Sequence, residues 1–371
     1  MAYFPVTLVV GTRPEAIKLA PVARALAARG MPFQIAVTGQ HPSLDLATYG
    51  LNSFSSIELG CAGMADPVAH AAAVASAFRS VAEQTSLIIV QGDTSSALGG
   101  AMAGFAVGTP IAHVEAGLRS HDPDLPWPEE SNRVAIDAGA ALLFAVTDVS
   151  AANLRAEGVE GEIHVTGNTG IDALREILGK VPLPHLGVVQ DKPVLLVTCH
   201  RRENWGSAFD PIAEALNHLG ATGRLQIDLL LPPNPSMAQT MRDKLAGCFS
   251  IRLRDPVDHV GMINAMRSSS LILSDSGGVQ EEAPALGVPL LVLRTKTERP
   301  EGVLSGNIRL AGSSCERIVE EVTRLLDDQT AYARMAQARL PYGDGHAADR
   351  IAQVTLDWLV RQGRGSKRHL A

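Results

Sequence analysis

Cysteine and aromatic residues are scarce in this chain. Of the 371 residues only four are cysteines, and aromatic side chains make up 4%. The cysteines stand far apart in the sequence, at Cys61, Cys199, Cys248 and Cys315. Because no CxxC pair or Cys/His ligand spacing occurs, the pattern predicts neither a disulfide framework nor a zinc site, and we expect no metal. Reduced thiols are typical of the cytoplasm, which is the location we expect.

Long apolar runs and an excess of positive charge are also missing. No stretch reaches the roughly 18 uninterrupted apolar residues that a membrane-spanning helix needs. No charged residue precedes Arg13, so the basic start of a signal peptide is lacking. The formal net charge is −7, which argues against general nucleic-acid binding. We therefore expect neither a membrane nor a nucleic acid as a partner.

Apolar residues are plentiful, and they form short β-branched runs that alternate with longer Ala- and Leu-rich runs. The expected strands are Val6–Val10, Gln34–Val37, Leu87–Val90, Ile111–Val114, Leu143–Val146, Ile163–Val165, Val194–Val197, Ile227–Leu231, Leu271–Ser274 and Leu290–Leu293. The expected helices include Ala16–Arg29, Pro67–Glu83, Ser95–Val107, Val134–Ala141, Ala208–Leu219, Met237–Leu245 and Ser314–Leu326. This alternation predicts an α/β protein with doubly wound parallel sheets, buried on both faces.

The chain is long enough for two domains. The segment Gly179–Pro193 contains three prolines and no clear period, which is typical of a linker. We expect a Rossmann-like domain over 1–178, a second one over 190–345, and a terminal helix and tail over 346–371, with the helix able to pack back on the first domain. In such a pair of domains facing a cleft, ligands bind at the carboxyl ends of the strands.

Charged residues follow the first expected strand. Gly11-Thr12-Arg13-Pro14-Glu15 leads directly into a helix, with Pro14 suited to its first turn. Arg13 and Lys18 would lie near the helix start, at the carboxyl edge of the sheet. They predict an anion or sugar-phosphate site, and the alternative is an ordinary turn with solvated charges.

Three carboxylates follow later strands of the first half. Asp93 ends a strand, and its alternative role is a helix cap. Glu115 ends a buried strand and needs either a structural partner, such as Arg119, or a role in acid/base chemistry. Glu129 starts a helix within a rigid Pro-Trp-Pro loop, where it would also suit the helix dipole.

The second half carries a basic loop after its first strand. His200, Arg201 and Arg202 follow the strand Val194–Val197. A phosphate, a carboxylate or a leaving group is the expected partner of this cluster. A solvated basic loop is the alternative.

A glycine-rich turn follows the strand Leu271–Ser274. Ser276, Gly277 and Gly278 precede a helix, and their backbone N–H groups would hold a phosphate at its positive end. Glu282, one turn into the helix, would accept hydrogen bonds from a ribose, and Arg299 adds a cation. The motif is neither GxGxxG nor a P-loop, and a glycine-eased turn capped by Asp275 is the alternative. Together, the two halves have the layout expected of a nucleotide-sugar enzyme.

Nine motifs in order closely resemble the non-hydrolysing UDP-N-acetylglucosamine 2-epimerases. They are GTRPEAIKLAPV, TGQH, QGDTSS, HVEAGLRS, PWPEESNR, TGNTGIDAL, HRRENWG, DSGGVQEEAPALG and TERPEGV, between residues 11 and 303. The resemblance implies a glycosyltransferase-B-like fold, a homodimer, no cofactor, and interconversion of UDP-GlcNAc and UDP-ManNAc. It also implies that UDP is eliminated from the sugar and added back, with 2-acetamidoglucal as the intermediate.

The resemblance further implies the site residues. Catalytic positions match Arg13, Asp93, Glu115, Glu129 and His200, and substrate-binding positions match Lys18, Ser276, Gly277, Gly278, Glu282 and Arg299. Carboxylates would transfer protons at C2, while Arg13 and His200 would serve the departing diphosphate. Which carboxylate serves which face of C2 stays open.

The chain departs from the family pattern at the loop expected to hold uracil. His259 and Met262 stand where the family commonly has Tyr and Phe, which weakens stacking on the base. The departures allow epimerisation of another UDP-2-acetamido sugar, such as a 6-deoxy sugar or a uronate. A hydrolysing epimerase that releases ManNAc and UDP, and a retaining glycosyltransferase, remain as alternatives.

Overall fold

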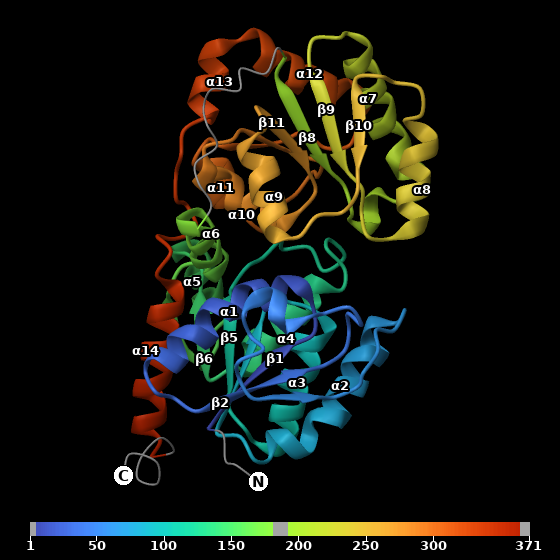
Figure 1. Cartoon of the computed structure of the whole chain (residues 1–371). Coiled ribbons are helices and arrows are strands. Elements are labelled where there is room, and N and C mark those ends of the chain that lie inside the picture. The colour runs from blue at the N-terminus through green and yellow to red at the C-terminus, as the bar shows by residue number, and fades with distance from the viewer. Residues whose placement is uncertain (1–4, 181–191, 364–371) are drawn as a thin grey trace. The chain divides into compact units, whose positions relative to one another are not determined.

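The computed structural model describes residues 5–180 and 192–363. Its contacts divide the chain into two compact units (Figure 1). The first unit comprises Met1–Arg175 together with Tyr342–Ala371, and the second comprises Glu176–Pro341. The last helix therefore belongs with the amino-terminal half. The linker expected at Gly179–Pro193 and the tail expected after Gly363 lie mostly outside the described residues.

The first unit is built on a seven-stranded sheet in which all neighbouring strands are parallel. Its strands are β1 (Val6–Val10), β2 (Phe33–Val37), β3 (Ser56–Glu58), β4 (Leu87–Gln91), β5 (Ile111–Ala116), β6 (Leu142–Ala145) and β7 (Glu162–Val165). They lie in the order β3-β2-β1-β4-β5-β6-β7. The direction of winding reverses between β1 and β4, so this unit is doubly wound, as the alternation predicted.

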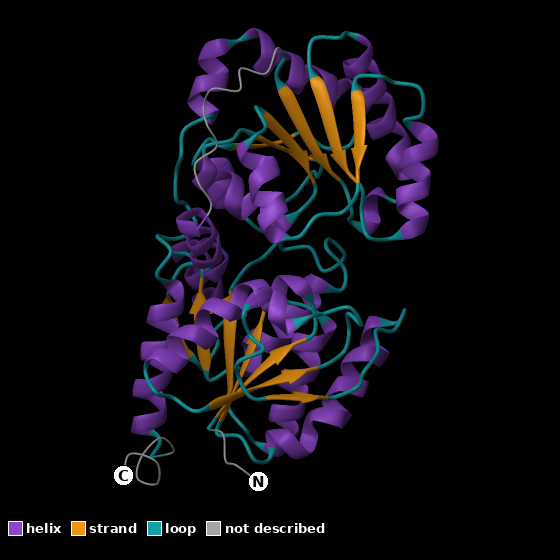
Figure 2. Ribbon diagram, viewed as in Figure 1, coloured by secondary structure: helices purple, strands orange, loops and turns teal. Residues whose placement is uncertain are grey.

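Helices cover both faces of this sheet (Figure 2). They are α1 (Arg13–Ala28), η1 (Leu46–Tyr49), α2 (Pro67–Ala82), α3 (Ser95–Val107), α4 (Glu129–Gly139), α5 (Asp148–Ala156), α6 (Thr169–Lys180) and α14 (Ala347–Arg361), of which α6 continues past the division at Arg175. Alternate residues of β1 pack into two separate hydrophobic cores. Leu8 packs with α1 and α14, including Trp358, whereas Val9 packs with α2 and α3, including Phe78.

The second unit repeats this plan with six parallel strands. They are β8 (Val194–Thr198), β9 (Gln226–Leu230), β10 (Ile251–Arg254), β11 (Leu271–Ser274), β12 (Leu290–Val292) and β13 (Ile308–Leu310). Their order is β10-β9-β8-β11-β12-β13, the Rossmann order, with the reversal between β8 and β11. The helical segments are η2 (Arg202–Asn204), η3 (Gly206–Phe209), α7 (Asp210–Ala221), α8 (Pro235–Lys244), α9 (His259–Arg267), α10 (Gly277–Leu286), α11 (Pro300–Leu304), α12 (Cys315–Asp327) and α13 (Gln329–Met335).

The sequence analysis did not predict three of the strands, and all three lie at sheet edges. β3, β10 and β13 have three or four residues each, and they carry exposed side chains such as that of Arg252. An edge strand this short alternates too briefly, and buries too little, to produce a periodic apolar signal. The long central strands, buried on both faces, were predicted correctly.

The order of the strands decides where ligands can bind. In each unit the carboxyl ends of the two strands at the reversal lie side by side, and the loops that follow them diverge to opposite faces. Those loops start at Gly11 and Gly92 in the first unit, and at Cys199 and Asp275 in the second. No helix within the described ranges combines the length and apolar character needed to span a bilayer.

Candidate active site

In the first unit the predicted site residues gather at the carboxyl edge of the sheet. Arg13 follows β1, Asp93 follows β4, Glu115 lies at the end of β5, and Glu129 starts α4. Because β1, β4 and β5 are neighbours in the sheet, these residues come from adjacent loops. The sequence placed them at the same edge, and the structure shows which side chains meet there.

The backbone at Glu115 is unusual. Its φ is +73°, a conformation that side chains other than glycine rarely adopt, and the pairing of β5 with β6 is irregular between Val114 and Ala116. Such an irregularity turns a side chain away from its regular direction, and strained residues of this kind cluster at functional sites. The carboxylate of Glu115 is consequently directed toward α1 rather than into the regular pleat.

Glu115 is held by two donors. The Lys18 ammonium donates to Glu115 Oε2 at 2.6 Å, and the Gln91 amide donates to the same oxygen. Both charged side chains are nearly buried, with side-chain exposures of 10% for Lys18 and 6% for Glu115. Arg119, the partner considered from the sequence, instead contacts Asp137 and Glu157. Lys18, expected to bind an anion, is thus the partner of a candidate acid/base group.

Asp93 is paired rather than used as a helix cap. Its carboxylate accepts from Arg133 on α4, and its backbone carbonyl accepts from the Asn132 side chain at 2.8 Å. Thr94 caps α3 in its place. Glu129 lies one turn before Arg133 on the same helix and is half-buried. Asp93 and Glu129 are therefore both located by the first turns of α4.

Arg13 is the most accessible predicted cation of the first unit. Its side chain is exposed, and its guanidinium makes a long hydrogen bond of 3.4 Å to Ser43 Oγ. Its backbone N–H donates to His41 Nδ1, also at 3.4 Å. Burial, and then the Arg13 charge, hold the pKa of His41 below its ordinary value. An exposed guanidinium beside a neutral imidazole suits a phosphate that arrives with the substrate.

Glu15 connects the loop of Arg13 to the loop of Asp93. Its buried carboxyl accepts from the backbone N–H groups of Gly11 at 2.6 Å and Thr12 at 2.7 Å, and from the Thr94 hydroxyl. Burial raises its pKa to about 7, against the opposing effect of these hydrogen bonds. The sequence assigned Glu15 only to the positive end of the helix.

The raised pKa predicts a pH-dependent stability. Between its ordinary pKa of 4.5 and the folded value of about 7, Glu15 keeps its proton in the folded chain and releases it on unfolding. The stabilisation present below the lower value is therefore lost as pH rises through the upper one, by on the order of 3 kcal/mol. We expect urea denaturation to show this loss for the wild type relative to Glu15→Gln. A stability difference that does not vary with pH would contradict it.

In the second unit the start of α10 carries the glycine-rich motif. Ser276 caps the helix by accepting from the Val279 N–H at 3.5 Å, which corrects the suggestion that Asp275 is the cap. A Cβ added at Gly277 would lie 2.9 Å from the Arg299 guanidinium, so only glycine leaves room for that cation against the helix start. Gly278, the next residue, is half-buried. The start of the helix, where backbone N–H groups favour anions, and a cation thus occur together.

Arg299 is fixed by two buried carboxylates. It donates through Nε to Glu281 at 2.7 Å and through a terminal nitrogen to Glu298. Glu298 also accepts from Arg294 at 2.9 Å, and Arg294 reaches Glu203 at 3.1 Å. This network connects the loop after β12 with the basic loop after β8. The sequence analysis missed Glu298, although its place in the TERPEGV motif was the available signal.

Asp275 organises the loop that carries His200. Its fully buried carboxylate accepts from the backbone N–H groups of His200 and Arg201 at 2.9–3.1 Å and from the Asn204 amide at 2.9 Å. The His200 ring lies 3.3 Å from the same carboxylate, with about half of its side chain exposed. Trp205 donates to the His200 carbonyl at 3.0 Å. The imidazole is therefore presented beside the start of α10.

Glu282 already has a partner. His259 Nε2 lies 2.6 Å from Glu282 Oε1, and both side chains are mostly buried. His259 is one of the residues that replace the aromatic pattern of the uracil loop. The replacement thus places an imidazole on the carboxylate that was expected to receive a ribose.

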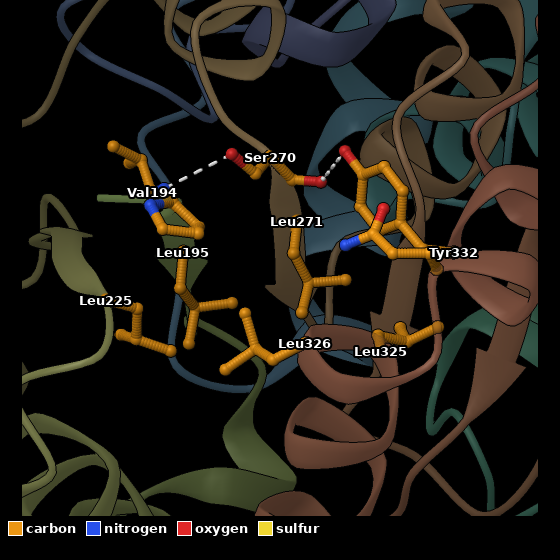
Figure 3. Close-up of a pocket in the computed structure, with 10 residues that line it drawn as sticks. Val194, Leu195, Leu225, Ser270, Leu271, Leu325, Leu326 and Tyr332 are labelled. Atoms are coloured by element: carbon orange, nitrogen blue, oxygen red, sulfur yellow. Dashed lines mark hydrogen bonds between the residues drawn. The ribbon is translucent and has the colours of Figure 1, made fainter. Parts of the chain in front are cut away.

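An apolar pocket of the second unit lies elsewhere. A pocket of about 230 Å³ is lined by Val194, Leu271 and Tyr332, among others, at the amino ends of β8 and β11 (Figure 3). The Tyr332 hydroxyl donates to the Ser270 carbonyl at 2.9 Å. Because this edge is opposite to the one that carries His200 and Ser276, we do not include the pocket in the site. Among residues 5–180 and 192–363, no cluster of acidic, histidine and cysteine side chains has the arrangement of a metal site.

Comparison with known proteins agrees with this layout. A family model described as UDP-N-acetylglucosamine 2-epimerase matches residues 24–356. The enzyme of that name from Yersinia pestis is 40% identical over 368 residues, covering 94% of this chain and 97% of the relative. Its counterpart in Escherichia coli K12 is 38% identical over 370 residues, covering 94% and 97%.

Solved structures give the same result. The UDP-GlcNAc 2-epimerase of Neisseria meningitidis bound to UDP-GlcNAc superimposes with a TM-score of 0.89 at 34% identity, over 95% of this chain and 99% of that one. A Methanocaldococcus jannaschii UDP-GlcNAc 2-epimerase in complex with UDP-GlcNAc and UDP reaches 0.83 at 31% identity, over 94% and 99%.

Two doubly wound parallel sheets of the glycosyltransferase-B-like type, together with these solved relatives, place the chain among the nucleotide-sugar enzymes. The similarity over nearly the whole length narrows that class. The chain belongs to the UDP-N-acetylglucosamine 2-epimerase family and is an isomerase.

Proposed function

We propose that the first unit carries out the proton transfers by which UDP-GlcNAc and UDP-ManNAc are interconverted at C2. The observation that supports this most directly is Glu115, a nearly buried carboxylate on strained backbone, hydrogen-bonded by Lys18 and Gln91. A carboxylate fixed in this way is suited to take or give a proton at one defined point. Binding alone would not require it.

The proposed reaction has two balanced stages. A carboxylate takes the C2 proton, the electrons of that bond form the C1=C2 double bond, and the C1–O bond breaks to release UDP and 2-acetamidoglucal. UDP oxygen then adds to C1 while C2 receives a proton on the opposite face. Two faces require at least two acid/base groups, which Asp93, Glu115 and Glu129 supply.

The second unit is proposed to bind the nucleotide. The N–H groups at Ser276, Gly277 and Gly278 would hold the diphosphate at the positive end of α10. Arg299, fixed against Gly277, would add a charge-assisted hydrogen bond, and Glu282 would accept from the ribose.

Two basic side chains are proposed to help UDP leave. The exposed Arg13 guanidinium and the His200 imidazole would offset the charge that develops on the diphosphate as the C1–O bond breaks. Lys18 serves the same chemistry indirectly, because it pairs with Glu115.

The deciding experiment is NMR of the purified protein with UDP-GlcNAc in D₂O. Deuterium at C2 together with a growing UDP-ManNAc signal is the expected result. Free ManNAc and UDP would instead assign the hydrolysing reaction. No turnover with retained UDP binding would indicate another UDP-2-acetamido sugar and would direct attention to His259 and Met262. Turnover only when a glycosyl acceptor is added would indicate a glycosyltransferase.

We propose in addition that the chain acts as a homodimer in the cytoplasm. Helices α3 and α4 pack on each other and leave Met102, Phe105 and Val134 about two-fifths exposed, which suits contact with a second copy. The four cysteines are free, which fits a reducing compartment.

The dimer gives a testable expectation for this apolar face. We expect light scattering to give twice the chain mass for the wild type and a shift toward the monomer for Phe105→Glu, because a charge would be buried without a partner. Val360→Glu is the matched control, since Val360 is exposed on α14. A monomeric wild type, or an unchanged mass for Phe105→Glu, would refute this interface.

A further inference from the structure

His113 is a fully buried histidine in the middle of β5, a strand labelled in Figure 1. Its Nδ1 lies 2.6 Å from Asp137 Oδ1, and its Nε2 lies 2.8 Å from the backbone carbonyl of Gly92. None of the chemistry proposed so far uses it. A polar ring buried among apolar strands is costly unless both nitrogens are satisfied, as they are here.

Asp137 connects His113 to further residues of the first unit. Its carboxylate, on α4, accepts from the Gly117 N–H at 3.0 Å and lies 2.8 Å from the Arg119 guanidinium. Arg119 in turn makes a two-pronged contact with Glu157, at 2.7 and 2.6 Å. Two acids and two bases therefore alternate in one network, which is buried except at Glu157.

The hydrogen bonds define the charges in this network. A carbonyl oxygen can only accept, so His113 Nε2 carries a proton. Burial raises the pKa of Asp137, but the facing His113 and Arg119 side chains outweigh it and hold that pKa below its ordinary value, so Asp137 is ionised. Because this carboxylate also accepts from the Gly117 N–H and contacts Arg119, it is the acceptor, and His113 Nδ1 donates to it.

The attachment points of the network are the loops of the proposed catalytic carboxylates. Gly92, whose carbonyl accepts from His113, directly precedes Asp93. Gly117, whose N–H donates to Asp137, follows two residues after the strained Glu115. Asp137 itself lies on α4, which starts at Glu129 and carries Arg133, the partner of Asp93.

We infer that His113 and Asp137 form a buried positioning pair that holds Asp93, Glu115 and Glu129 in the mutual geometry needed for proton transfer at C2. The inference rests on the proposed function. Neither side chain would touch the substrate. Their effect is exerted through the Gly92 carbonyl, the Gly117 amide and the axis of α4. Because a carboxylate displaced by about 1 Å can cost roughly 10²-fold in rate, such a pair controls turnover more than binding.

The test compares Asp137→Asn with a matched variant. Asp172→Asn also removes a buried carboxylate of the first unit that accepts two backbone N–H groups, those of Ala347 and Ala348 at 3.1 and 2.8 Å. We expect Asp137→Asn to lower kcat roughly 10²-fold with little change in KM or in UDP affinity. Asp172→Asn should keep its kcat even where its thermal stability falls equally. An equal loss in both variants, or a kcat retained in Asp137→Asn, would overturn the inference.

A second measurement needs no variant. The ¹⁵N and ¹H NMR signals of His113 in the wild-type protein should show protons on both ring nitrogens at the pH of the assay, with the Nδ1 proton strongly downfield. A neutral ring would overturn the pairing, even where Asp137→Asn fails to fold. A wild type that shows no epimerisation would refute the proposed function instead, and the histidine spectrum would still decide the inference.

Discussion

Replacing Glu115 with glutamine should reduce kcat for epimerisation by roughly 10²–10⁴-fold, the usual contribution of a positioned acid or base. An amide of nearly the same shape can still accept from Lys18 and Gln91, but it cannot take a proton from C2. Affinity for UDP should be unchanged, because the proposed nucleotide-binding residues lie in the second unit. Steady-state kinetics and calorimetric titration with UDP measure the two quantities.

The control for this variant is Glu83→Gln, at the residue that caps the carboxyl end of α2. Glu83 is exposed and pairs with Arg79 at the surface, at 3.5 Å, so its charge contributes little. We expect Glu83→Gln to retain wild-type kcat and wild-type deuterium incorporation at C2. If Glu115→Gln kept C2 exchange at the wild-type rate, Glu115 would have no role in proton transfer.

Gly117→Ala should destabilise the protein by about 3 kcal/mol, a large effect for a single methyl group. Gly117 has a φ of +82°, which favours glycine, and an added Cβ would lie 2.2 Å from the Ser150 carbonyl oxygen. The backbone carbonyl of Ser150 cannot move aside as the end of a flexible side chain can. Turnover should also fall, because Glu115 is two residues away and the Gly117 N–H is held by Asp137.

Gly158→Ala separates the effect of the backbone conformation from the effect of the steric contact with Ser150. Gly158 has a φ of +69°, but an added Cβ there meets nothing within 4 Å. We expect this control to lose only about 1 kcal/mol, from backbone conformation alone. Urea denaturation of both variants measures the difference. Equal losses would mean that the contact with Ser150 relaxes at no cost and that the position of Glu115 is not defined in this way.

Several elements of the fold could be predicted from the sequence because their signals are local. Central strands such as Val6–Val10 are apolar on both faces, and each leads into a helix, which indicates a parallel doubly wound sheet. The rule that ligands bind at the carboxyl ends of such strands then placed Arg13, Asp93, Glu115 and Ser276 at the correct edges. The ordered motifs supplied the family.

The side-chain contacts of those residues could not be predicted from the sequence. The sequence offered Arg119 as the partner of Glu115, only four positions away, whereas the structure supplies Lys18, 97 positions earlier. It offered Asp93, with the following Thr and Ser as alternatives, as one cap and Asp275 as the other, and the structure uses Thr94 and Ser276. Each pairing depends on how neighbouring strands and helices are placed, which no local pattern records.

The sequence by itself determined the fold class, the family and the edge of each sheet at which the candidate site residues lie. Composition and periodicity indicate the fold class and the sheet edges, because they reflect which residues must be buried. The order of the motifs indicates the family. Only the tertiary structure decided which charges meet. Strand order and packing produce the irregular backbone at Glu115 and the burial that raises the pKa of Glu15. They also produce the network of His113 and Asp137, which contacts Gly92 and Gly117. Electrostatic interactions act over a few ångströms in space, whatever the distance along the chain.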